Sequence, residues 1–192
     1  NMKKKIKSYI KDSVDTFNQI IDSDELIEKI TQIANICIDA YQKDKKILFC
    51  GNGGSAADAQ HIAAELSGRF CIDRKPLNAE ALHVNSSFVT AVANDYGFEN
   101  IYSRMIEAVG RKGDVLFGIS TSGNSINVIN AIDKANRIGI TTIGLTGVNE
   151  KKLNDTCSLV INVPSKNTAR IQESHILIGH ILCQIIEEEL FL

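Results

Sequence analysis

Five short and almost uninterrupted apolar runs alternate with helical stretches along most of this chain. Runs of this length, apolar at consecutive positions, are typical of strands that are buried on both faces of a sheet. Strands that are joined by helices pair in parallel, because two parallel strands need a long crossover connection and a helix supplies it. The predicted strands are 47–50, 79–84, 115–119, 141–145 and 159–163. The pattern therefore predicts an α/β fold, a three-layer sandwich around a five-stranded parallel sheet.

Helical patterns separate these strands and also precede the first of them. Between and after the strands, the predicted helices are 56–66, 87–93, 100–109, 127–138 and 168–190. Two N-terminal helices, 3–21 and 25–42, come before the sheet, with Ser23 as the expected cap of the second. We therefore expect one domain, 1–192, with an N-terminal helical region of about 2–44 and an α/β core of 46–192. At least one N-terminal helix is expected to pack against another subunit.

The composition excludes several classes of protein. The formal net charge is −2, whereas binding to a phosphate backbone calls for a basic face, so nucleic acid is not an expected partner. No apolar run approaches the roughly 20 residues that cross a bilayer, and the N-terminal stretch is too polar for a secretory signal. The five cysteines lack Cys-x-x-Cys spacing, which favours reduced, buried thiols. We expect a cytoplasmic protein with no membrane partner.

A glycine-rich loop, 51–55, follows the first predicted strand and reads Gly-Asn-Gly-Gly-Ser. Glycines let a ligand approach the main chain closely, and ligands of parallel α/β sheets bind beyond the carboxyl ends of the strands. The glycine spacing also matches the loose dinucleotide fingerprint. However, 82–85 supply no acidic residue for a ribose at the end of the next strand. A dinucleotide-dependent oxidoreductase therefore ranks low.

A second loop, 120–125, follows the third predicted strand and reads Ser-Thr-Ser-Gly-Asn-Ser. Four hydroxyls beside the free amides of a helix N-terminus form an anion site. The simpler interpretation is that Ser122 or Asn124 caps the following helix, but four hydroxyls exceed what one cap needs. No lysine occupies the position that a nucleotide P-loop requires. The two loops together predict that the chain binds a phosphorylated sugar.

His61 and Glu65 stand four residues apart on the helix expected after the glycine loop, so they share one face. Such a pair binds a metal or acts as acid and base, and it is also a common exposed pair on helix surfaces. The final helix offers further polar candidates among apolar neighbours: Gln172, Glu173, His175 and His180. Spacing alone does not choose among them.

Asn94 and Asp95 precede Tyr96-Gly97 at what we expect to be another loop. Either side chain could hold sugar hydroxyls. A turn or a cap is an equally good interpretation of an isolated Asn-Asp pair.

Taken together, these motifs resemble the sugar isomerase (SIS) domain family. The resemblance rests on segments in the family's order and spacing: 51–61, 64–69, 93–98, 118–125 and 169–180. It implies a sheet of flavodoxin-like order and a homotetramer with active sites between subunits. Ala169 departs from the acidic residue that some family members carry before the arginine, so no carboxylate is expected there.

The resemblance also implies a set of site residues. One zinc ion per subunit would be held by His61, Glu65, Gln172 and His180. The phosphate would sit on Ser120, Thr121, Ser122 and Ser125. The sugar would be surrounded by Asn52, Gly53, Gly54, Ser55, Glu65, Arg69, Asn94, Asp95 and Gln172.

The activity that the resemblance implies is an aldose–ketose interconversion, from sedoheptulose 7-phosphate to D-glycero-D-manno-heptose 7-phosphate. This product is a precursor of bacterial surface heptose, in lipopolysaccharide or capsule. A proton moves between adjacent carbons through an enediol, so the site needs a base and an acid. We expect Glu65 as base and His180 as acid, with zinc polarising the oxygens. The alternatives are a non-catalytic SIS protein associated with the replication initiator, or a sugar-phosphate sensor; having both Glu65 and His180 favours the enzyme.

Overall fold

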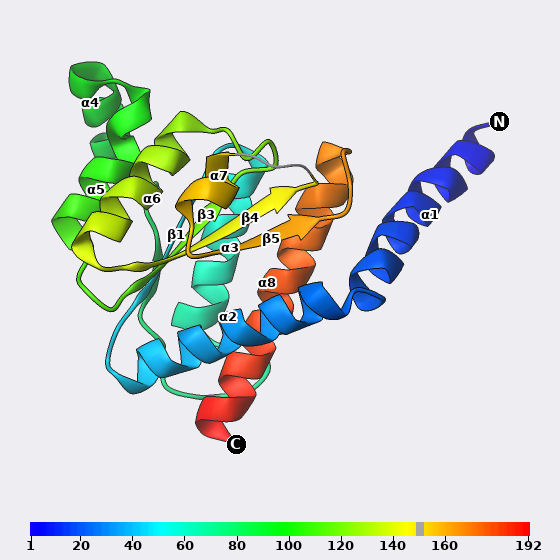
Figure 1. Cartoon of the computed structure of the whole chain (residues 1–192), viewed down its shortest axis with the longest axis horizontal. Coiled ribbons are helices and arrows are strands. Elements are labelled where there is room, and N and C mark those ends of the chain that lie inside the picture. The colour runs from blue at the N-terminus through cyan, green and yellow to red at the C-terminus, as the bar shows by residue number, and fades with distance from the viewer. Residues whose placement is uncertain (149–151) are drawn as a thin grey trace.

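A five-stranded parallel sheet forms the middle layer of the structure (Figure 1). The computed structural model describes residues 1–148 and 152–192. The strands are β1 (Ile47–Gly51), β2 (Ala79–Ala81), β3 (Val115–Ile119), β4 (Thr141–Gly147) and β5 (Leu159–Val163). Their order in the sheet is β2-β1-β3-β4-β5, and every pair is parallel. The predicted flavodoxin-like order is therefore confirmed, and the order reverses between β1 and β3.

Helices cover both faces of this sheet. They are α1 (Met2–Ile21), α2 (Asp24–Gln42), α3 (Gly54–Ser67), α4 (Ser86–Tyr96), η1 (Phe98–Asn100), α5 (Ile101–Val109), α6 (Ile126–Ile138), α7 (Lys152–Thr156) and α8 (Thr168–Phe191). Side chains alternate between the faces of a strand. Phe49 packs in the core beneath α2, α3 and α8, whereas Leu48 packs in the core beneath α4, α5 and α6. The predicted three-layer sandwich is confirmed.

Two predicted elements end three residues away from their predicted ends. The second strand covers only Ala79–Ala81, because it is an edge strand that pairs with β1 over three residues. Helix α4 is longer than predicted and includes Asn94 and Asp95, so the loop expected there was wrong. Asn85 caps its start by accepting from the Phe88 N–H, and Gly97, with φ +89°, ends it. The short elements η1 and α7 were not predicted.

Helix α1 projects from the body of the chain toward the N-terminus (Figure 1). Two residues of α8 hold it: Arg170 donates to the Tyr9 carbonyl at 3.0 Å, and Glu173 accepts from the Ser13 hydroxyl at 2.8 Å. Four apolar residues of α1 are 47–59% exposed: Ile6, Tyr9, Ile10 and Val14. Throughout 1–148 and 152–192, no helix combines the length and the apolar character that crossing a membrane requires.

Candidate active site

The glycine loop joins β1 to α3 at the point where the strand order of the sheet reverses. Gly53 has φ +56°, a conformation that favours glycine, and it begins α3 without any side-chain cap. The first amides of α3 are therefore left without a capping side chain, which favours binding of an anion. A Cβ on Gly54 would lie 2.7 Å from the side-chain amide of Gln172, so only glycine leaves this close approach open.

A pair of amides ties the glycine loop to the helix after β3. The Asn52 side chain donates to Oδ1 of Asn127 at 2.9 Å, and Asn127 donates back to Oδ1 of Asn52 at 2.8 Å. Asn127 is only 3% exposed. In addition, the Tyr102 hydroxyl donates to the Gly51 carbonyl. The amide pair of Asn52 and Asn127 thus links the segments that follow the neighbouring strands β1 and β3.

In the serine loop, residues 120–125, three hydroxyls lie close to one another, and the N-cap hydroxyl does not cap the following helix. Ser120 Oγ lies 2.9 Å from Ser125 Oγ and 3.3 Å from Ser122 Oγ. Ser125 is the N-cap residue of α6, yet its side chain makes no capping hydrogen bond. The capping interpretation of this loop therefore does not account for its hydroxyls. The side chain of the N-cap residue bonds to none of the first amides of α3 or α6, although Asn127 Oδ1 accepts from the Val128 N–H in the first turn of α6. The remaining free amides beside small residues favour the binding of a phosphate at both helix starts.

A surface cleft of about 320 Å³ opens beside the serine loop. Thr121 and Ser122 line one side of it. Ser165, Lys166 and Thr168 line the other side, from the connection between β5 and α8. The cleft thus combines hydroxyl groups and the Lys166 cation with the apolar side chains of Val148 and Ile171. It lies at the carboxyl end of the sheet, where α/β proteins bind their ligands.

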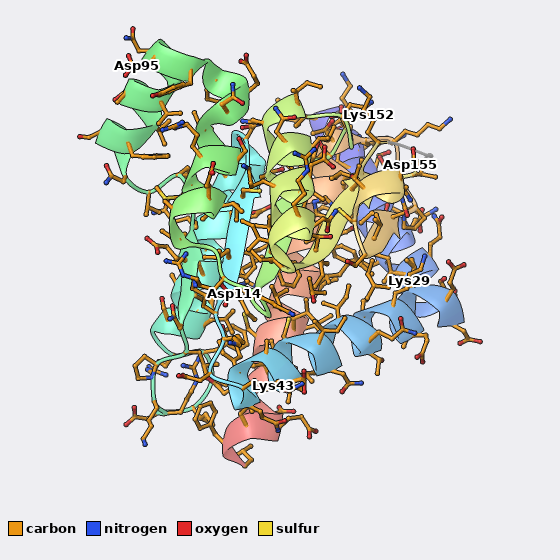
Figure 2. The ribbon with its side chains drawn as sticks, turned by 60° about the vertical axis from the view of Figure 1, so that its left-hand side comes forward. Lys29, Lys43, Asp95, Asp114, Lys152 and Asp155 are labelled. Atoms are coloured by element: carbon orange, nitrogen blue, oxygen red, sulfur yellow. The ribbon has the colours of Figure 1, made fainter. Side chains whose placement is uncertain are left out.

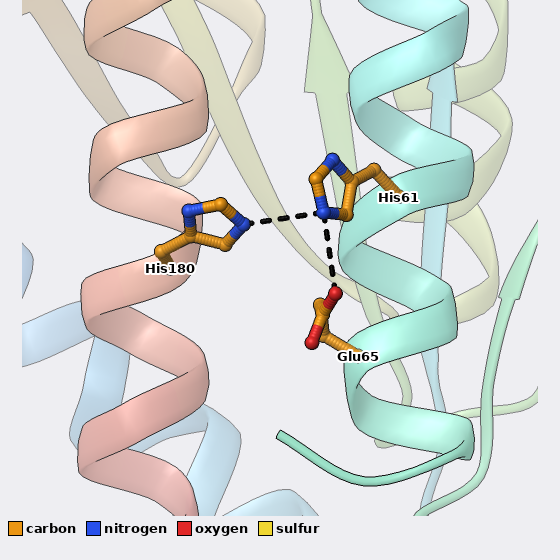
Figure 3. A group of neighbouring side chains, drawn as sticks. All are labelled: His61, Glu65 and His180. Atoms are coloured by element: carbon orange, nitrogen blue, oxygen red, sulfur yellow. Dashed lines mark hydrogen bonds and ion pairs between the residues drawn. The ribbon is translucent and has the colours of Figure 1, made fainter. Parts of the chain in front are cut away.

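Three side chains that can bind a metal meet between α3 and α8 (Figure 3). His61 and Glu65 come from α3, and His180 comes from α8. His61 Nε2 lies 3.2 Å from Glu65 Oε1 and 3.3 Å from His180 Nε2. One ligand atom from each residue lies within 4.8 Å of the other two. The predicted face of His61 and Glu65 therefore meets His180 within a single chain.

Close packing of the two helices brings these rings together. Gly179 precedes His180, and a Cβ on it would lie 2.5 Å from Cδ1 and 2.7 Å from Cγ1 of Ile62. Ile62 in turn follows His61 in α3. The absence of a side chain at residue 179 thus sets how near His180 comes to His61.

The donor set and spacing of this cluster fit a zinc ion. Two imidazole nitrogens and a carboxylate are zinc ligands, with bonds of about 2.0–2.1 Å to nitrogen. Ligand atoms of a tetrahedral site at such bond lengths are roughly 3.4 Å apart, close to the 3.2 and 3.3 Å found here. The two facing Nε2 atoms also avoid repulsion if a cation lies between them.

Two further residues surround the cluster. The ring of Phe70 stacks on His180, with centroids 5.5 Å apart and an angle of 25° between the planes. Asp58 precedes His61 by nearly one helical turn, and its Oδ2 is buried. Burial raises the pKa of Asp58 to about 6, although nearby His61 opposes this rise. Phe70 thus contacts His180, and the acidic group of Asp58 lies near His61.

A family model for the SIS domain matches residues 8–147, most of the chain. The chain belongs to the SIS domain family. Its curated relatives include the phosphoheptose isomerase of Clostridium acetobutylicum, 52% identical over 190 residues, which cover 99% of this chain and 97% of that protein. The phosphoheptose isomerase of Sulfurimonas denitrificans is 50% identical over the same shares of the two chains.

A solved SIS domain of a phosphoheptose isomerase agrees with this fold. The structure from Neisseria gonorrhoeae is 41% identical and has a TM-score of 0.92. The alignment covers 98% of this chain and 100% of that chain. The similarity therefore extends over the N-terminal helices as well as the sheet.

A single chain brings together only some of the predicted site residues. The Gln172 side chain lies against Gly54, seven residues or about 10 Å along α3 from His61. Asn94 and Asp95 bond to each other at the exposed tip of α4, where Asp95 points outward (Figure 2). Arg69 is exposed just beyond the end of α3. A single chain brings His61, Glu65 and His180 together, and the roles of the others stay predictions.

The structure separates His180 from its competitors on α8. His175 is fully buried, and its Nε2 donates to the Thr146 carbonyl at 3.1 Å. Burial lowers the pKa of His175 to about 4. Glu173 is bound to Arg170 on the same helix, at 2.6 Å. His175 therefore anchors α8 to β4, Glu173 helps to hold α1, and His180 alone of the three faces α3.

The sequence reading missed Asn127 and Phe70. Asn127 was taken as the first residue of a helix, and its only signal is a polar side chain at the start of an apolar face. Phe70 stands in an irregular stretch after α3, with no periodicity to place it. Each depends on a partner that is distant in sequence.

Proposed function

We propose that this chain is a phosphoheptose isomerase, which interconverts sedoheptulose 7-phosphate and D-glycero-D-manno-heptose 7-phosphate. The observation that carries the proposal is the meeting of His61, Glu65 and His180 between α3 and α8. Relatives named phosphoheptose isomerase, about half identical over nearly the whole chain, support the choice of substrate. No observation favours a non-catalytic SIS protein or a sensor.

The residues of the cluster can divide the proton transfers between them. Glu65 is the base: one carboxylate oxygen faces His61, and the other takes the proton from the carbon next to the carbonyl. His180 is the acid, which supplies a proton to the oxygen of the enediol. Glu65, whose proton exchanges with solvent during the lifetime of the enediol, then protonates the neighbouring carbon. His180 takes back a proton from the hydroxyl on the carbon that was first deprotonated, and this carbon becomes the new carbonyl. Because substrate oxygens must reach both groups, the reacting carbons lie between α3 and α8.

His61, Glu65 and His180 would hold a zinc ion, with Gln172 as a fourth ligand that reaches the site from its position near Gly54 or from another subunit. Such an ion, when bound, supplies polarisation of the carbonyl and hydroxyl oxygens. His61 makes no proton transfer in this scheme and serves to orient the site.

The serine loop and the glycine loop bind the rest of the substrate. Ser120, Thr121, Ser122 and Ser125 hold the phosphate, aided by the free amides that remain at the start of α6. Asn52, Gly53, Gly54, Ser55, Arg69, Asn94 and Asp95 surround the sugar. Because Asn94 and Asp95 lie at an exposed tip, they serve the site of a neighbouring subunit.

The chain assembles as a homotetramer in the cytoplasm. The exposed apolar residues of α1 support assembly, because a projecting helix with such a face gains by covering it. The heptose phosphate that the isomerase forms feeds heptose synthesis for lipopolysaccharide or capsule.

The test follows turnover and isotope entry together. Purified protein loaded with zinc is incubated with sedoheptulose 7-phosphate in deuterated water. We expect the aldose to form with deuterium at the exchanging carbon, since an enediol exchanges its proton with solvent. Glu65→Gln and His180→Ala should each abolish turnover and leave the circular dichroism spectrum unchanged. If the wild-type protein gives neither aldose nor deuterium, the isomerase proposal is wrong.

A further inference from the structure

A buried ion pair lies beside the candidate active site, between Arg74 and Glu187. Their side chains are 1% and 2% exposed, and Arg74 Nε lies 2.8 Å from Glu187 Oε2. Buried charges are tolerated when they are paired and fully hydrogen-bonded. The other bonds of this pair show which segments it holds together.

Glu187 binds the backbone of the loop that follows α3. Its carboxylate accepts from the N–H groups of Phe70 at 3.0 Å, Cys71 at 2.6 Å and Ile72 at 2.8 Å. Burial alone would raise the pKa of Glu187, but these three donors and Arg74 hold it below its ordinary value. The carboxylate is therefore charged, and three consecutive amides fix the loop on α8.

Arg74 binds the end of α3. Its guanidinium donates to the carbonyls of Leu66 at 2.8 Å, Gly68 at 3.2 Å and Glu65 at 2.9 Å. Carbonyls at a helix C-terminus lack partners within the helix, and a cation there is stabilising. Since Glu65 belongs to the candidate active site, Arg74 fixes the backbone of a site residue.

The loop held by Glu187 places Phe70 on His180. The ring of His180 contacts two others: Phe70 stacks on it with centroids 5.5 Å apart, and His61 meets it edge-on with centroids 4.9 Å apart. His180 and Glu187 are seven residues apart on α8, which puts them on the same side of the helix. Glu187, which binds the loop, and His180, which is covered by a residue of that loop, thus lie on the same face of α8.

We propose that Phe70 is a positioning residue for His180, held in place by the buried pair of Arg74 and Glu187. This inference rests on the proposed isomerase function, in which His180 must keep its ring aimed at the reacting atoms. The ring torsion of a histidine is broad, so packing against a neighbour is what selects one orientation. Phe70 acts on turnover through His180, without touching the substrate.

The first experiment replaces Phe70. Phe70→Leu removes the flat stacking surface and keeps an apolar side chain. We expect kcat to fall by about tenfold to hundredfold, the range for a catalytic group displaced by up to 1 Å. KM should change by less than about twofold, because the binding loops are untouched. Phe70→Tyr keeps the ring and should restore kcat.

Phe88→Leu is the matched control, because Phe88 is also a partly buried phenylalanine but packs in the core on the other face of the sheet. It should leave kcat unchanged. If Phe70→Leu keeps the kcat of the wild type, or loses kcat only in proportion to a lower melting temperature shared with Phe88→Leu, the positioning role is wrong.

A second readout needs no turnover. The chain has four histidines, so the ring nitrogens of His180 can be followed in metal-free protein labelled with ¹⁵N-histidine. We expect Phe70→Leu to move the His180 signals, and Phe88→Leu to leave them in place. Moved signals in a protein whose wild type does not isomerise the sugar would support positioning and refute the proposed function. Unmoved signals would refute positioning, whatever the activity.

Variants of Arg74 and Glu187 test whether this ion pair, the clamp, holds Phe70 in place. Arg74→Lys keeps the charge but loses the fork that reaches the carbonyls of Glu65, Leu66 and Gly68. We therefore expect kcat to fall and the His180 signals to move in the same direction as in Phe70→Leu. Glu187→Gln should do the same if it folds. A folded Arg74→Lys variant with the kcat and His180 signals of the wild type would overturn the clamp.

Discussion

The contact between Gly179 and Ile62 predicts how sensitive the candidate active site is to the spacing of two helices. In Gly179→Ala, the new Cβ would lie 2.5 Å from Cδ1 and 2.7 Å from Cγ1 of Ile62. Carbon atoms in contact prefer about 3.5–4.0 Å, so the helices must separate, or Ile62 must move, by roughly 1 Å. Because Gly179 precedes His180 and Ile62 follows His61, this movement falls on the cluster.

The effects on stability and on activity should differ in size. Crowding a packed core costs about 1–3 kcal/mol, whereas replacing glycine by alanine inside a helix gains up to about 1 kcal/mol. The net loss of about 0–3 kcal/mol lowers the melting temperature by at most about 12 °C in a chain of this size. A displacement of 1 Å in a catalytic site costs about 100-fold in rate. We therefore expect Gly179→Ala to fold and to lose most of its kcat/KM.

Second substitutions at Ile62 separate geometry from stability. Ile62→Ala removes both crowded carbons and leaves only Cβ, at 4.0 Å from the new methyl group. Gly179→Ala with Ile62→Ala should therefore regain activity while losing further stability, since truncating a buried isoleucine costs about 2–5 kcal/mol. Ile62→Val removes the carbon at 2.5 Å but keeps the one at 2.7 Å, so it should restore activity in part.

The measurements are kcat/KM with sedoheptulose 7-phosphate, and urea or thermal unfolding of each variant. Gly110→Ala is the control, because its Cβ would be crowded by the Ile106 carbonyl oxygen at 2.6 Å and by Ile140 Cδ1 at 2.7 Å, on the other face of the sheet. It should lower stability and leave kcat/KM unchanged. A Gly179→Ala variant with the kcat/KM of the wild type would refute the argument, and so would a double variant with no more activity than the single one.

Two further predictions concern the metal and the pH. Dialysis against a zinc chelator should abolish turnover and leave the fold intact, and added zinc should restore turnover; metal analysis that finds active protein without zinc would contradict the ligand assignment. The pKa of His175 is lowered by burial from 6.5 to about 4, so its contribution to stability is complete above pH 6.5 and is lost as the pH falls toward 4. The loss amounts to about 3 kcal/mol. Urea denaturation from pH 8 to 4 should show a shallower fall for His175→Gln than for the wild type, and equal slopes would disprove this contribution.

The sheet could be predicted from the sequence because each strand is a local signal. A run such as 115–119 is apolar throughout and is bounded by polar or glycine-containing stretches. The edge strand was predicted too long, because the extent of β2 depends on how far β1 offers it a partner. Likewise, α4 was predicted too short, because its end is set by Gly97 rather than by a change in polarity.

The candidate active site was predictable only where its residues share an element. His61 and Glu65 could be paired from their spacing on one helix. The choice of His180 over His175 could not be made from spacing, because it depends on which side of α8 meets α3, and that is set by the contact of Gly179 with Ile62. Glu187 reads as one more acid in the last turns of a helix until Arg74, 113 residues away, is found beside it.

Helix α3 connects the phosphate-binding loop, the metal-binding cluster and the buried ion pair. Its first turn, at Gly54, offers uncapped amides and meets Gln172, its middle carries His61, and its last turn, with Glu65, is held by Arg74. Anion-binding loops are a property of many α/β folds, so they identify the ligand as a phosphate without implying chemistry. The catalytic proposal depends instead on the middle and the end of α3, where α8 supplies His180 and the buried carboxylate of Glu187. The residues that separate an enzyme from a simple phosphate binder are therefore those at the interface of α3 and α8.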